Sequence, residues 1–182
     1  RSSGHATDSD HLGTRLESLA MLGVMAFAAI LTPFIGQNFG AQNYDRIYES
    51  VRYGSRFSMI WGVAACALLA LAAHPIALVF NDTESVQSMI RLFLWIVPLS
   101  FGFYGMTMLA GSACNGLNRP LQSAAINFAR LFFLVVPLAW WGSRSWGLLG
   151  LFVGISAGNI LSGAVSIIWL RARLLSRILT IN

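Results

Sequence analysis

Long runs of apolar residues alternate with short polar segments along the chain. Asp, Glu, Lys and Arg are absent from Phe57 to Asn81, from Leu92 to Asn118 and from Ser145 to Leu170. A helix of about 20 apolar residues crosses a hydrocarbon core of about 30 Å, so each run is long enough to span a bilayer with some tilt. A soluble fold of 182 residues is too small to bury three such helices on every side. The pattern therefore predicts an all-α integral membrane protein.

Two further apolar segments raise the number of expected transmembrane helices to about five. Short segments with turn residues, such as NDTES, NGLNRP and GSRSWG, separate the helices. We expect one helical bundle over residues 18–173, preceded by a polar segment over 1–17 that belongs to an outer loop and followed by a cytoplasmic tail over 174–182. The expected spans cover about residues 19–37, 57–80, 92–114, 121–141 and 146–170.

Composition agrees with this interpretation, because 56% of the residues are hydrophobic and only 10% are charged, whereas about a quarter are charged in a soluble domain. The net charge of +5 comes from arginine alone, since the chain has no lysine. The arginines flank apolar runs, which is typical of topology signals and not of a nucleic-acid interface.

The arginines also predict an orientation. With five spans, seven arginines fall on one side of the membrane and four on the other. The first set comprises Arg46, Arg52, Arg56, Arg119, Arg171, Arg173 and Arg177. By the positive-inside rule this side is cytoplasmic, so we expect a cytoplasmic C-terminus. The N-terminus is then outside, and the polar segment after Arg1 does not resemble an export signal. A further helix before Arg1 would explain this, so we expect a fragment or a processed chain.

Arg130 is the most unusual residue, because it is the one charge in an otherwise apolar span. An arginine in mid-membrane costs about 2.5–3.5 kcal/mol on insertion scales, so it is expected to face the protein interior or a wet cavity. It either locks neighbouring helices together or contacts a substrate. Asn127 lies one turn earlier on the same helix face.

Two other segments carry candidate residues. Tyr104 and Met106 offer an adaptable surface suited to a hydrophobic binding wall, or equally to helix packing. Glu17 is either an interfacial charge at a helix start or a gate or cation ligand. The stripe Gly150, Gly154, Gly158 and Ser162, with a spacing of four, predicts close helix packing.

The segment GQNFGAQNYDR lacks the ending of a Walker phosphate loop. We interpret it as a helix end at the inner interface, with Gly40 as the cap; direct substrate contact is the alternative. Its helix-end residues are Gly36, Gln37, Asn38 and Gly40. No residue set suits a metal site, an organic cofactor or intramembrane hydrolysis, so an enzyme is not expected.

Taken together, these segments resemble the C-terminal half of multidrug and toxic compound extrusion (MATE) transporters over about residues 12–173. The most specific match is PFIGQNFGA followed by Arg46, supported by Asn115, Gly116, Arg119 and Pro120 and by Arg130 with Pro137.

The resemblance implies a twelve-helix transporter made of two six-helix lobes, of which this chain supplies the eighth to twelfth helices. It also implies a drug or organic-cation antiporter coupled to H⁺ or Na⁺ in a bacterial inner membrane. Amphipathic or cationic small molecules, the lipid bilayer and the absent N-terminal lobe would be its partners. A lipid-linked saccharide flippase of the same superfamily and a non-transporting remnant are the alternatives.

Overall fold

The computed structural model describes residues 3–80 and 84–179, and it describes side chains over residues 21–73 and 87–172. All elements in the described residues are helical, so the all-α prediction is confirmed. In chain order they are α1 (Ser3–Gly40), α2 (Tyr44–Phe80), α3 (Glu84–Ile96), η1 (Val97–Ser100), α4 (Phe101–Gly116), α5 (Pro120–Ala129), η2 (Arg130–Val135) and α6 (Val136–Leu179).

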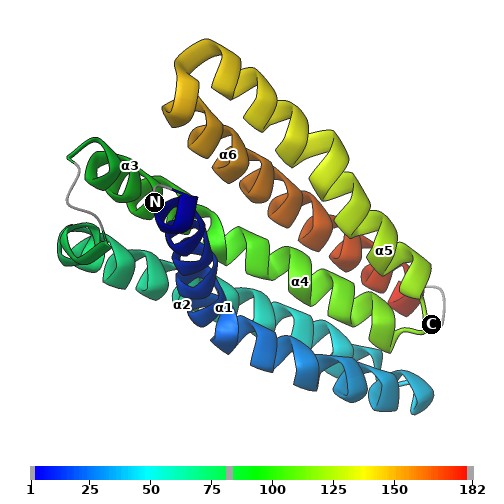
Figure 1. Cartoon of the computed structure of the whole chain (residues 1–182). Coiled ribbons are helices and arrows are strands. Elements are labelled where there is room, and N and C mark those ends of the chain that lie inside the picture. Colours follow the sequence, from blue (N-terminus) through cyan, green and yellow to red (C-terminus); the bar gives the residue numbers. More distant parts are fainter. Residues whose placement is uncertain (1–2, 81–83, 180–182) are drawn as a thin grey trace.

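Four helical stretches in the described residues are long and apolar enough to cross a membrane. They are Met21–Gly40, Tyr44–Ala73, Gln87–Gly116 and Pro120–Ala172. The fourth folds back on itself inside α6, where Trp146 and Gly147 leave helical geometry and Gly147 has a φ of 59°. Figure 1 shows the two arms of this hairpin lying side by side. The chain therefore makes the five passes that the apolar pattern predicted.

Two helices extend well beyond their apolar spans. The backbone of α1 is helical from Ser3, although the sequence placed residues 1–17 in an outer loop. The helix α2 begins at Tyr44, so the arginine-rich segment before residue 57 is helical as well. Hydrophobicity marks only the part of a helix that lies in lipid. The first proline of the chain is Pro33, so no proline ends α1 earlier.

Helix α4 runs through the middle of the bundle and packs against α1, α2, α5 and α6 (Figure 1). Small residues let it approach its neighbours closely. A Cβ built at Gly116 would lie 2.6 Å from the Thr32 carbonyl oxygen of α1. The Ser58 hydroxyl of α2 donates to the Gly102 carbonyl at 2.8 Å. Serine and threonine hydroxyls thus supplement van der Waals packing along the central helix.

The two arms of the α6 hairpin are in backbone contact. A Cβ built at Gly150 would collide with the carbonyl of Gly142, and one built at Gly154 would collide with the carbonyl of Leu138. At Gly158, a Cβ would lie 2.8 Å from the Cα of Val135. The predicted role of this glycine stripe in close packing is confirmed.

Two prolines change the helical geometry inside spans. Pro98 lies in η1, a 3₁₀ turn between α3 and α4. Pro137 follows η2, a π-helical segment in which the Val136 N–H donates to the Leu131 carbonyl five residues earlier. A proline has no N–H and its ring crowds the carbonyl four residues back. A wider turn before Pro137 relieves that crowding, and π-segments of this kind are frequent at functional sites.

Candidate functional site

Arg130, the first residue of η2, holds its guanidinium against two other helices. Its Nη1 donates to Oδ1 of Asn159 on α6 at 2.9 Å. Its Cζ lies 4.7 Å from the ring centroid of Tyr104 on α4, within the range of a cation–π interaction. Its Nε is buried and has no hydrogen-bond acceptor among the described residues.

The amide of Asn159 extends this contact into a polar chain. Its Nδ2 donates to the Ser100 hydroxyl at 3.3 Å, and that hydroxyl donates to the Val97 carbonyl at 2.8 Å. One turn before Asn159, the Ser156 hydroxyl donates to the Ile96 carbonyl at 3.2 Å. The 3₁₀ turn at Pro98 and the π-segment before Pro137 are thereby joined through α6.

No carboxylate pairs with Arg130 among the described side chains. The acids within residues 21–73 and 87–172 are Asp45 and Glu49, both in the first turns of α2. Arg130 is half-buried, so part of its charge is stabilised by neutral dipoles and the Tyr104 ring. Neutral partners compensate a buried charge less fully than a counter-ion does. The guanidinium therefore keeps donor capacity for an anion.

The other two sequence candidates lie elsewhere. Met106 is half-buried and packs against the hydrophobic cluster that contains Ile35 and Leu109. Asn127 is exposed and donates from Nδ2 to the Ser123 carbonyl of its own helix at 3.1 Å. The structure thus brings Tyr104 and Arg130 together, while Met106 and Asn127 do not join them.

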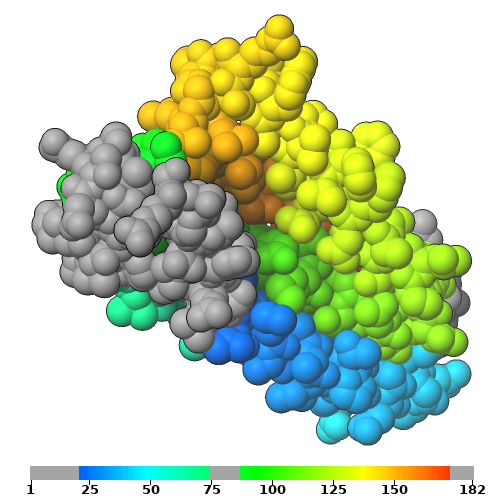
Figure 2. Space-filling model, in the orientation of Figure 1, coloured from blue at the N-terminus to red at the C-terminus, as the bar shows by residue number. Residues whose placement is uncertain are grey.

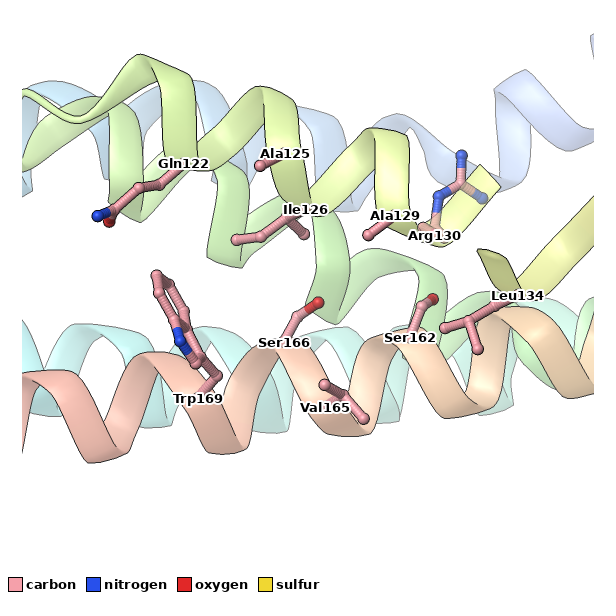
Figure 3. Close-up of a pocket in the computed structure, with 10 residues that line it drawn as sticks. All are labelled: Gln122, Ala125, Ile126, Ala129, Arg130, Leu134, Ser162, Val165, Ser166 and Trp169. Atoms are coloured by element: carbon pink, nitrogen blue, oxygen red, sulfur yellow. The ribbon is translucent and has the colours of Figure 1, made fainter. Parts of the chain in front are cut away.

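A cavity of about 290 Å³ lies between α5 and the second arm of α6. Ser162, Ser166 and Trp169 project into it from α6, as Figure 3 shows. Arg130 contributes to its wall at one end (Figure 3), and its Nη1 bonds Asn159 on the same arm of α6. The cavity and the guanidinium site therefore adjoin each other at Arg130.

The segment GQNFGAQNYDR contains the end of α1, which stops at Gly40. The N–H of Asn43 donates to the Asn38 carbonyl at 2.9 Å and that of Gln42 to the Phe39 carbonyl at 3.2 Å. This is the bonding pattern of a Schellman motif. Its left-handed residue is Gln42, with a φ of 58°, so Gly40 is the last helical residue and not the cap.

The neighbouring residues Gly36, Gln37 and Asn38 belong to the last turns of α1. Asn38 is buried, and its Nδ2 donates to the Phe34 carbonyl at 2.8 Å. Gly36 lies against α4, where a Cβ would sit 3.5 Å from the Gly116 carbonyl. Gln37 is exposed. Packing inside the bundle thus explains why Gly36 and Asn38 occupy their positions, whereas it does not explain Gln37.

Helix α4 ends in the same way as α1. Asn118 has a φ of 59°, and the N–H of Arg119 donates to the Cys114 carbonyl at 2.9 Å. Asparagine tolerates the left-handed region better than most residues.

The side chain of Glu17, proposed above as a gate or cation ligand, lies outside the described side chains.

Sequence reasoning missed Ser100 and Asn159, although both contribute to the polar chain around Arg130. Asn159 is an amide inside an uncharged run of 26 residues, from Ser145 to Leu170, and that isolation was a usable signal. Ser100 carries no such signal, because serine is common in membrane helices and its role depends on what faces it.

Comparison with known proteins places the chain in a family. The MatE family model matches residues 6–141. An FAD transporter of Shewanella oneidensis is 33% identical over 151 residues, which cover 83% of this chain and 33% of the relative. The probable multidrug resistance protein NorM of Neisseria meningitidis serogroup A is 26% identical over 127 residues, covering 70% of this chain and 28% of the relative.

The crystal structure of the Vibrio cholerae MATE transporter VcmN in the bent form superposes with a TM-score of 0.89 at 31% identity. The alignment covers 96% of this chain and 40% of that transporter. The chain thus spans about a third of the length of these curated relatives, and its fold is that of part of a MATE transporter. From the family match, the helical architecture and these relatives together, we conclude that the chain belongs to the MATE family of membrane transporters.

Proposed function

We propose that this chain forms most of the C-terminal lobe of a secondary active efflux transporter, which exports amphipathic or cationic compounds in exchange for H⁺ or Na⁺. The observation that carries the proposal is Arg130, a charge held inside a membrane-spanning segment against Tyr104 and Asn159. Ionisable residues at such depth usually mark a transport pathway.

A concave surface supports the same proposal. In the space-filling view, α4 lies recessed between α1 and the segment formed by α5 and η2 (Figure 2). We propose that these three segments form the wall that contacts the substrate. In the intact transporter the second lobe would close this surface into a cavity, and relative movement of the lobes would open it to either side of the membrane.

Ion coupling would depend on residues other than the described side chains. The two acids among the described side chains, Asp45 and Glu49, lie in the first turns of α2 and not in mid-span. Coupling usually requires a membrane-embedded carboxylate. We therefore place the binding site of the coupling ion in the rest of the transporter or at Glu17. The expected location is a bacterial inner membrane, with the C-terminus in the cytoplasm.

A flavin dinucleotide is a second candidate substrate. The relative from Shewanella oneidensis that is 33% identical to this chain is an FAD transporter. FAD carries negatively charged phosphates. These would accept from the unpaired donor of Arg130, whereas an organic cation offers that donor no negative charge.

A chimera tests the proposal. The chain would replace the matching 40% of the Vibrio cholerae transporter, and export of a fluorescent cationic dye and release of FAD would be measured from cells. We expect export of at least one compound above the level of cells that express the Vibrio remainder alone. A chimera that reaches the membrane in normal amount but exports neither compound would favour a non-transporting remnant.

A further inference from the structure

We propose that the Arg130 guanidinium is a binding site for the anionic group of an amphipathic ligand, a carboxylate or a phosphate. The inference rests on the proposed function only in placing this surface on a transport pathway. It deepens that function by assigning the ligand chemistry of this one site, opposite in charge to the cations that the family resemblance suggests.

The first argument is the unused donor capacity of the guanidinium. Arginine has five N–H donors and no acceptor, and the hydrogen bond of the Arg130 side chain to Asn159 uses Nη1 alone. The Nε donor is buried and has no acceptor among the described residues. A buried donor left without an acceptor is costly. A carboxylate or phosphate that accepts from the remaining Nη donors would add charge-assisted bonds to this incompletely paired guanidinium.

The second argument is that the guanidinium is held in place before any ligand arrives. Asn159 fixes Nη1 and is itself fixed by Ser100, while the Tyr104 ring lies under the guanidinium carbon. None of these partners carries a negative charge, so none competes with an anion. A positioned guanidinium loses less entropy on binding than a flexible one.

The third argument concerns the ligand's remaining surface. Arg130 lies within the apolar span Pro120–Ala172, and the residues after it in η2, Leu131, Phe132 and Phe133, are exposed hydrophobics. A small inorganic anion would lose its hydration here without apolar contacts in return. An anion attached to an apolar or aromatic body would gain them, so the class is an amphipathic anion.

The test uses the 182-residue chain in nanodiscs of neutral phosphatidylcholine, with empty nanodiscs as the blank. Three probes share one fluorophore and differ in charge: dansylglycine is an anion, dansylglycinamide is neutral and dansylcadaverine is a cation. We expect the wild-type chain to bind dansylglycine about tenfold or more tightly than the other two, as charge-assisted bonds would give. Equal affinity for the three probes, or a preference for the cation, would overturn the proposal.

Variants locate the site. Arg130→Gln should remove the preference for dansylglycine, whereas Arg144→Gln should keep it. Arg144 is a matched control, since it is exposed and its Cζ lies 5.5 Å from the Trp140 ring centroid. An Arg130→Gln chain that binds dansylglycine as the wild type does would sink the proposal. If that variant does not fold, the three-probe comparison on the wild-type chain still decides.

A second arm identifies the natural source of the anion. Nanodiscs containing phosphatidylglycerol will weaken dansylglycine binding if a lipid phosphate occupies the site, and will leave it unchanged if the ligand is water-soluble. Both outcomes support an anion site. The assay requires no transport, so an exporting chimera with no anion preference would refute this inference alone. If the nanodisc assay shows a preference for the anion that depends on Arg130, but the chimera does not export, only the proposed function is refuted.

Discussion

At the scale of single residues, Asn159 is the partner on which the position of Arg130 depends. It is 8% exposed, accepts from Arg130 and donates to Ser100. Its two polar atoms therefore face two different elements, η2 and η1. An amide suits this position because it offers an acceptor and a donor at once.

We expect Asn159→Leu to destabilise the chain by about 2 kcal/mol, because it leaves Nη1 of Arg130 without its acceptor. Thermal unfolding in detergent, followed by circular dichroism, measures the change. Asn127→Leu is the matched control: Asn127 is exposed and bonds only within its own helix, so we expect a change within about 0.5 kcal/mol. Equal losses of stability in the two variants would contradict the role of Asn159.

At the scale of elements, the α6 hairpin positions the Arg130 site. Its first arm follows directly from η2, and its second arm carries Asn159. The two arms meet without side chains between them at Gly150 and Gly154. This backbone contact sets the separation of the two arms, and therefore the distance that the Arg130 side chain must span to bond Asn159.

We expect Gly154→Ala to destabilise the hairpin by about 1–3 kcal/mol, because the added Cβ collides with the Leu138 carbonyl and forces the arms apart. Thermal unfolding again provides the measurement. Gly40→Ala is the control, since Gly40 is the last residue of α1 and no atom lies within 4 Å of a Cβ built there. Should Gly154→Ala prove as stable as Gly40→Ala, the arms are less closely packed than described.

At the scale of the whole molecule, the five passes put the two ends of the chain on opposite sides of the membrane. The described fold fixes the number of passes but not their direction. We predict the direction from the arginines, seven of which flank the side that holds the C-terminus, which makes that side cytoplasmic by the positive-inside rule. The Schellman motifs that end α1 and α4 lie on this same side.

We expect green fluorescent protein fused after Asn182 to be fluorescent and alkaline phosphatase fused there to be inactive, because both results indicate a cytoplasmic C-terminus. Reporters inserted at Ser143 should give the opposite result, since the α6 turn faces the other side. Active phosphatase at the C-terminus would reverse the orientation proposed here.

The sequence alone determined the membrane environment, the all-α class and the five passes, and it singled out Arg130 as a lone charge in an apolar span. Each of these follows from one-dimensional patterns, because lipid requires long uncharged helices and penalises a lone charge. The glycine stripe also identified a packing face, since its spacing is local.

Only the tertiary structure showed what surrounds that charge. Ser100 and Tyr104 come from one stretch of the chain and Asn159 from another, and no periodicity relates either stretch to Arg130. The fold brought Tyr104 to the arginine, packed Met106 against the core cluster instead and shifted the α1 cap from Gly40 to Gln42. These outcomes depend on helix rotation and on the bonds that close each helix end, and those are set by contacts between elements and not by residue type.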